Sequence, residues 1–135
     1  MGKTVAILVA RLIFAGVFAM AAIFKFAGMA DTAGYIAAAG FPFPLLLAWL
    51  AAIFETVLAL AFLTGAFFSE AALLAGIYVI FLGFAFHGPS YWEGNQAEFG
   101  FFIDHFTFLA GLLFAAVYGP GDVLAARQSF IGQRD

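Results

Sequence analysis

The sequence contains no cysteine and little charge. Without cysteine the chain can form no disulfide and no thiolate, and it can neither ligate an iron–sulfur cluster nor attach a c-type haem covalently. Charged residues make up 10% of the chain, against about 25% in an ordinary soluble domain. The five basic residues form no stripe, which excludes a nucleic-acid-binding surface. A redox role would therefore need a non-covalently bound cofactor or a cofactor of a partner protein.

Hydrophobic residues, in contrast, fill 66% of the 135 positions, and 20 of them are phenylalanine. A membrane-spanning helix needs about 20 mostly apolar residues, so four spans with short turns use nearly the whole chain. The sequence therefore predicts an all-α integral membrane protein: a four-helix bundle forming a single transmembrane domain over residues 1–135.

Glycine and proline mark the breaks between the apolar runs. Pro42 and Pro44 suit the first turn of a helix, because the backbone donor that proline lacks would be unpaired there. We expect Ser69 and Glu70 to form the turn between the second and third helices. The expected segments are spanning helices over residues 5–27, 42–68, 70–87 and 99–118, an interfacial segment over 31–40, and a short cytoplasmic tail over 122–135.

The basic residues outside the spans predict the orientation. Cytoplasmic loops carry an excess of Lys and Arg, and here these residues are Lys3, Arg127 and Arg134, all near the two ends of the chain. The loops after the first and third spans carry acidic residues instead, namely Asp31, Glu93 and Glu98, and no basic residue. We therefore expect both termini to be cytoplasmic, which an even number of spans permits.

Five ionisable residues fall within the apolar runs: Arg11, Lys25, Glu55, Asp104 and His105. Each charge costs about 2.5–3.5 kcal/mol at the centre of a span, so each needs a partner or a purpose. Counting 1.5 Å per residue from the helix starts predicts two layers of opposite charge. Arg11 pairs with Glu55 near mid-membrane, and Lys25 pairs with Asp104 nearer the external side.

The external layer is also a candidate site for a ligand headgroup. Lys25, Asp104 and His105, with His87 and Trp92 at the nearby helix end, could bind a quinone headgroup beside the phenylalanines of the last helix. The alternative is that both charge layers only fix which helices face each other. A haem or metal bound by His87 and His105 is disfavoured, because counting residues predicts different depths for the two imidazoles.

The pattern resembles the DoxX family of four-helix bacterial membrane proteins. The likeness covers most of the chain and rests on Arg11 to Phe14, Lys25-Phe26, Gly40-Phe41-Pro42, Glu55, Leu63-Thr64-Gly65 and Leu109 to Leu113. The family commonly has Lys-Asn where this chain has Asp104-His105, which reverses a charge. The resemblance implies a multi-pass protein of the bacterial inner membrane.

The resemblance also implies a function without fixing it. One hypothesis is a membrane subunit associated with a quinone-linked oxidoreductase or another respiratory or redox complex. The alternative is a noncatalytic accessory subunit that packs on a larger membrane complex and stabilises it, and a transporter is a weaker third option. The expected partners are the lipid bilayer and either membrane or extracytoplasmic redox proteins or a second copy of the chain. Whether the chain is itself an enzyme is left open.

Overall fold

The computed structural model describes residues 2–131, and all regular structure in that range is helical. The elements are α1 (Gly2–Ala27), α2 (Met29–Ala38), α3 (Pro44–Thr64), α4 (Phe68–His87), the 3₁₀ turn η1 (Pro89–Tyr91) and α5 (Gln96–Tyr118). Four stretches, namely α1, α3, α4 continued through η1, and α5, are long and apolar enough to cross a membrane. The predicted all-α class with four spanning helices is confirmed.

The helix ends follow from local backbone chemistry. Pro44 is the first residue of α3, where its missing N–H removes no hydrogen bond. Gly65 ends α3 in the left-handed conformation, with φ of 80°, and its N–H donates to the carbonyl of Ala61 at 2.9 Å. The turn therefore lies at residues 65–67, and Ser69 and Glu70, expected within the turn, instead belong to the first turn of α4.

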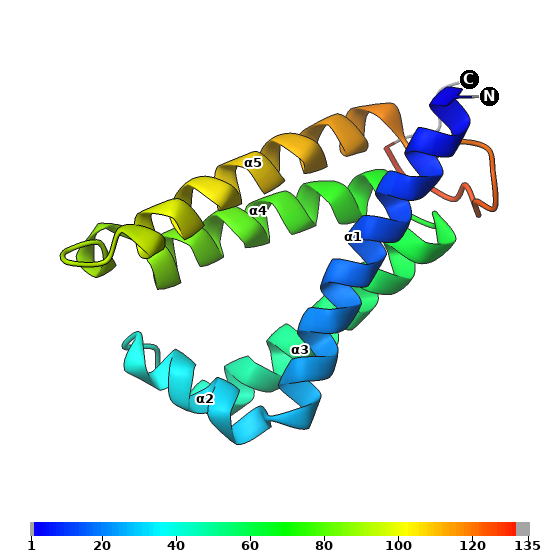
Figure 1. Cartoon of the computed structure of the whole chain (residues 1–135). Coiled ribbons are helices and arrows are strands. Elements are labelled where there is room, and N and C mark those ends of the chain that lie inside the picture. The colour runs from blue at the N-terminus through cyan, green and yellow to red at the C-terminus, as the bar shows by residue number, and fades with distance from the viewer. Residues whose placement is uncertain (1, 132–135) are drawn as a thin grey trace. The chain divides into compact units, whose positions relative to one another are not determined.

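The described chain divides into two compact units, which we treat separately. The first unit contains residues 2–66 and 120–127, with α1 and α3 side by side and antiparallel and α2 against α3 (Figure 1). Its core combines small and aromatic residues: Ala15 and Ala22 are buried, and the rings of Phe18 and Phe62 stack 5.6 Å apart. Small side chains let the two helix backbones approach closely.

The second unit contains residues 67–119 and 128–131, in which α4 and α5 form an antiparallel pair (Figure 1). The pair is closest at two glycines of α4. A Cβ at Gly83 would lie 3.0 Å from the Cβ of His105, and one at Gly76 would lie 3.0 Å from the side chain of Leu109. Glycine is therefore the residue that lets α5 lie against α4 at the level of His105.

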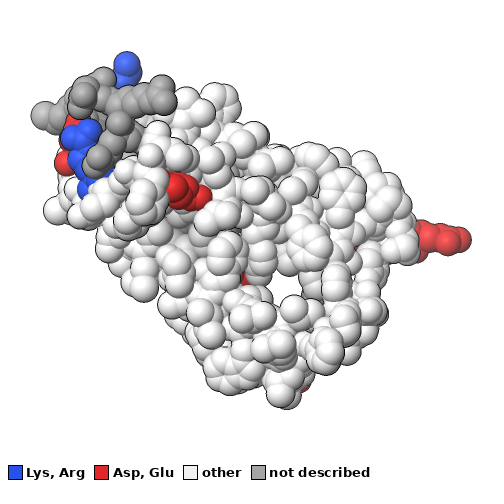
Figure 2. All heavy atoms as spheres, turned by 180° about the vertical axis from the view of Figure 1, so that it is seen from behind, with Lys and Arg blue, Asp and Glu red and all other residues white. Residues whose placement is uncertain are grey.

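Much of the apolar side-chain surface is exposed rather than buried. Phe114 and Val117 on α5 are 80% and 92% exposed, and Ile23 on α1 is 62% exposed. Figure 2 shows one face of the molecule with few acidic or basic side chains among the other residues. Water would not solvate such a surface favourably, whereas lipid chains would, so this is a multi-pass membrane protein.

Candidate functional site

Arg11 is the most completely bonded side chain of the first unit. An arginine has five N–H donors, and here all five donate to backbone carbonyl oxygens. Nε donates to Phe62, Nη2 to Leu63 and Leu124, and Nη1 to Pro120 and Val123, over distances of 2.8–3.3 Å. The residue is 1% exposed, so its charge is neutralised by carbonyl dipoles rather than by water.

These bonds complete the C-terminal end of α3. The last four carbonyls of a helix have no partner within the helix. In α3 the carbonyl of Ala61 accepts from Gly65, those of Phe62 and Leu63 accept from Arg11, and that of Thr64 accepts from the N–H of Ala126 at 2.7 Å. Arg11 and the segment after α5 thus supply hydrogen-bond donors to the last carbonyls of α3, which lipid would leave unpaired.

The predicted pairing of Arg11 with Glu55 is therefore wrong. Arg11 lies at the level of the last turn of α3, and its donors are already committed to carbonyls. Glu55 instead pairs with Lys25, whose Nζ lies 2.9 Å from Oε1. Helix direction explains the exchange, because each Cα–Cβ bond tilts toward the N-terminus of its own helix. In antiparallel helices, Lys25 near the end of α1 and Glu55 in mid-α3 therefore lean toward each other.

The Lys25–Glu55 ion pair is largely enclosed. The side chain of Glu55 is 3% exposed and that of Lys25 is 23% exposed. Lys25 is therefore the member of the pair that is accessible from the surface. Asp104, the partner expected for Lys25, is exposed on α5 in the second unit. The pairing of Lys25 with Asp104 stays a prediction.

The second unit contains a cluster of two histidines and a carboxylate at the end of α4 and the start of α5. Nδ1 of His87 lies 2.6 Å from Oε2 of Glu98, and both side chains are about one-fifth exposed. The ring of His105 lies 5.2 Å from that of His87, centroid to centroid. Nδ1 of His105 lies 2.6 Å from the carbonyl oxygen of Phe101. We call His87, Glu98 and His105 the imidazole cluster.

The two histidines were expected at different depths. His105 lies beside Gly83, one turn before His87 on α4, so their backbone positions do differ, although their rings are neighbours. The side chains close the gap, because that of His87 leans back along α4 while that of His105 leans toward the start of α5. Residue counting located the Cα atoms and left out the direction of the side chains.

Aromatic rings surround the imidazole cluster. Nε1 of Trp92 donates to the carbonyl of His87 at 2.7 Å, which holds the indole over the end of α4. The Trp92 ring meets those of Phe99 and Phe102 at 5.0 and 5.1 Å, and Phe101 lies 5.4 Å from the His87 ring. The arrangement combines flat apolar walls with a few directed polar groups, as ligand sites commonly do.

Two acidic residues of the second unit were not among the predicted site residues. Glu98 was treated only as an acidic loop residue, although its place in the first turn of α5, shortly after the end of α4, was a signal that it could reach His87. Glu70 was assigned to a turn, but its Oε1 accepts from Ser129 Oγ at 2.8 Å and from the N–H groups of Phe130 and Ile131. No motif or spacing around Glu70 signals that contact.

The hydrogen bonds limit the tautomers of the imidazole cluster. A carbonyl oxygen only accepts, so Nδ1 of His105 carries the proton and Nε2 is the acceptor in the neutral ring. Glu98 has the same effect on His87 when its carboxylate is ionised. Both Nε2 atoms can then accept a proton or, once protonated, donate one. Across residues 2–131, no group of three or more His, Cys, Asp or Glu side chains is arranged to hold a metal ion.

A comparison with known protein families supports the resemblance seen in the sequence. The family model described as DoxX matches residues 6–88, more than half of the chain. The matched region includes Arg11, Lys25, Glu55 and His87 and ends before α5, so Asp104 and His105 lie outside it. No curated protein and no solved structure matches the chain.

Proposed function

Because the chain belongs to the DoxX family, we propose that it is a membrane subunit of a quinone-linked oxidoreductase or another redox complex. In this proposal the imidazole cluster binds the quinone headgroup and exchanges protons with it. The observation that carries the proposal is the 2.6 Å contact between His87 and Glu98, with the ring of His105 beside it.

The chemistry of quinone reduction suits these groups. A quinone takes up two electrons and two protons to become a quinol, and its two carbonyl oxygens become hydroxyl groups. Because the imidazole Nδ1 atoms are already in hydrogen bonds, Nε2 of His87 or His105 is the atom that can donate a proton to a carbonyl oxygen and recover it later. Glu98 stabilises the imidazolium form of His87 during that exchange. The electrons come from the redox partner in the complex.

The aromatic residues support the same assignment. A quinone ring is flat and apolar apart from its two oxygens, so it stacks favourably on rings such as those of Trp92, Phe101 and Phe102. Trp92 is held in place by its hydrogen bond to His87. The site would thus offer two proton-exchanging nitrogens and walls that match the faces of the ring.

Replacing Glu98 with glutamine tests the proposal. We expect Glu98→Gln to weaken binding of a short-chain ubiquinone analogue by about tenfold, because a hydrogen bond to a charged group contributes about 1.5–3 kcal/mol. Binding would be measured in lipid nanodiscs by titrating the protein in a Trp49→Phe background, which leaves Trp92 as its one tryptophan, and following the quenching of tryptophan fluorescence. Glu93→Gln, at an exposed position in the loop just before α5, is the matched control and should leave binding unchanged.

The accessory-subunit alternative rests on a different observation. The buried charges of the first unit have structural contacts: Arg11 donates to backbone carbonyls, and Lys25 forms an ion pair with Glu55. If the wild-type protein binds no quinone analogue and remains monodisperse only together with a co-purifying membrane protein, the accessory role replaces the quinone role. Binding that is equal in the wild type, Glu98→Gln and Glu93→Gln would also remove the imidazole cluster from the proposal.

A further inference from the structure

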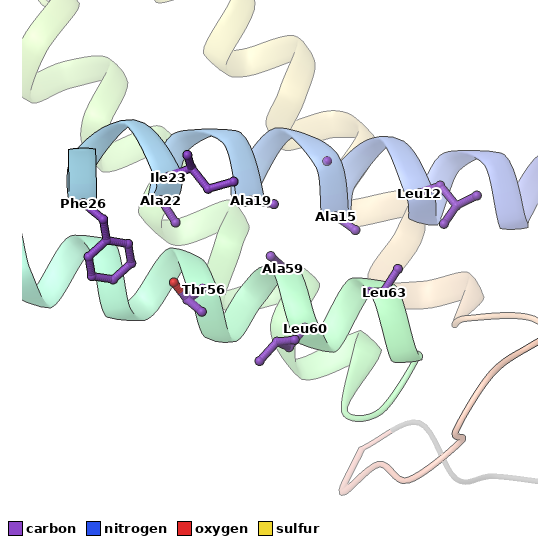
Figure 3. Close-up of a pocket in the computed structure, with 11 residues that line it drawn as sticks. Leu12, Ala15, Ala19, Ala22, Ile23, Phe26, Thr56, Ala59, Leu60 and Leu63 are labelled. Carbon is purple, nitrogen blue, oxygen red and sulfur yellow. The ribbon is translucent and has the colours of Figure 1, made fainter. Parts of the chain in front are cut away.

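The first unit has a groove between α1 and α3 that the proposed quinone site does not use. Figure 3 shows the groove, with Leu12 toward one end and Phe26 at the other. It has a volume of about 510 Å³ and is lined by seven residues of α1 and four of α3. Among the lining residues, Thr56 alone has a polar side chain, and its hydroxyl already donates to the carbonyl of Ala52 at 2.8 Å. The groove is therefore built for a hydrocarbon occupant.

Small residues of α1 create the space. Ala15, Gly16, Ala19 and Ala22 line the groove, and a Cβ added at Gly16 would meet no atom within 4 Å. Larger side chains, including Leu12, Phe26 and Leu60, flank them. The hollow thus comes from missing side-chain volume rather than from separated helices, and α1 and α3 remain packed below it.

The dimensions of the groove determine what can enter it. Leu12 and Phe26 are 14 positions apart, which at about 1.5 Å per residue gives a length of about 21 Å. The volume of about 510 Å³ spread over that length describes a long, shallow groove suited to an elongated occupant. A single unbranched hydrocarbon chain fits, because carbon atoms in contact lie about 3.5–4.0 Å apart.

We propose that the α1–α3 groove binds one acyl chain of a membrane phospholipid. The chain lies along the small residues of α1, and the phosphate lies at the Phe26 end. Lys25 is adjacent to Phe26, and its side chain is 23% exposed. An ammonium group has three donors, so Lys25 can contact a phosphate oxygen while it remains paired with Glu55. This proposal does not depend on the quinone site, which lies in the other unit.

Photo-crosslinking tests the proposal directly. The full chain would be reconstituted in vesicles of phosphatidylethanolamine and phosphatidylglycerol with a trace of a phospholipid bearing a diazirine on its acyl chain. Labelled residues would be mapped by mass spectrometry. We expect labelling to concentrate on the groove residues of α1 and α3 rather than on exposed faces such as those of Ile13 and Val17.

A variant and a matched control make the result specific. A Cβ at Gly16 has open space around it, and leucine favours the helix over glycine, so Gly16→Leu should fold. By filling the groove it should lower groove labelling by about tenfold, which corresponds to about 1.4 kcal/mol. Ala10→Leu, at an exposed position of α1 outside the groove, should leave labelling unchanged.

Three results would overturn the assignment. Even labelling of all exposed faces, unaffected by Gly16→Leu, would mean that lipid at the groove is no different from lipid elsewhere. Loss of labelling on adding a polyprenyl alcohol, but not excess phospholipid, would assign the groove to a branched isoprenoid chain. Because the chain has no cysteine, a Gly16→Cys variant that oxidises to a disulfide-linked dimer would show that a second copy covers this face.

Discussion

At the scale of single residues, Arg11 has the clearest energetic role in the molecule. Its guanidinium group takes the place of water as hydrogen-bond donor to five carbonyl oxygens, which lie in two parts of the chain, the end of α3 and the segment after α5. A carbonyl left unpaired in hydrocarbon costs several kcal/mol, so the charge and the five carbonyls stabilise each other. Lysine has the same charge but three donors and no planar fork, and therefore cannot replace it.

We predict that Arg11→Ala lowers the free energy of unfolding by about 3–5 kcal/mol, the cost typical of removing one partner from a buried charged network. Arg11→Lys should cost about 1–3 kcal/mol, because it keeps the charge and loses at least two hydrogen bonds. Unfolding in mixed detergent micelles, followed by circular dichroism, would measure both.

The control for Arg11 is another arginine of the same unit. Arg127 is paired with Asp122 at 3.2 Å, but its side chain is 69% exposed. Arg127→Lys should therefore change stability by less than about 1 kcal/mol. Equal effects at Arg11 and Arg127 would show that the five carbonyl bonds do not stabilise the fold.

At the scale of elements, the pairing of α1 with α3 depends on the ion pair of Lys25 and Glu55. A buried pair is costly to break by one substitution, since the remaining charge then lies alone in a low-dielectric environment. Replacing both partners with apolar residues of similar volume removes that cost. The pair therefore specifies which faces of the two helices meet rather than adding much net stability.

We therefore predict strong coupling between Lys25 and Glu55. Lys25→Met and Glu55→Leu should each lower the free energy of unfolding by about 3 kcal/mol. In the double variant the free energy of unfolding should lie within about 1 kcal/mol of the wild-type value. A double-mutant cycle measured by denaturant unfolding in micelles would give the coupling energy. If the two single costs simply add in the double variant, the ion pair does not hold α1 against α3.

The ends of the helices could be predicted from the sequence more closely than the contacts between side chains. Apolar run length and glycine or proline breaks are local properties, so the end of α3 at Gly65 and the end of α5 at Gly119 lie within a few residues of where the sequence suggests. The partner of Arg11 was not predictable, because its acceptors are backbone carbonyls that carry no residue-type signal. The contact of His87 with Glu98 was within reach, since the two residues flank one short loop.

At the scale of the whole molecule, segments far apart in the sequence meet within the first unit: the first half of α1 and residues 120–127. A Cβ at Gly121 would lie 3.1 Å from the side chain of Ile7, and Arg11 bonds to the carbonyl of Val123. The first half of α1 and the segment after α5 therefore lie at the same end of this unit. Four spanning helices require the same result, because an even number of crossings returns the chain to the side on which it began.

The side itself is predicted by charge. Lys3, in the first turn of α1, and Arg127, in the segment after α5, lie at this shared end, and Arg134 lies outside the described residues. The loop between α4 and α5 carries Glu93 and no basic residue. We therefore expect a cysteine at Gln128 to react with a membrane-impermeant maleimide only after permeabilisation, and one at Ser90 to react in intact cells. The unsubstituted chain, which has no cysteine, is the negative control.

The opposite labelling pattern would reverse the orientation, and labelling of both positions from one side would contradict four crossings. With the expected pattern, His87 and Glu98 lie at the extracytoplasmic surface, where a partner outside the membrane could reach them.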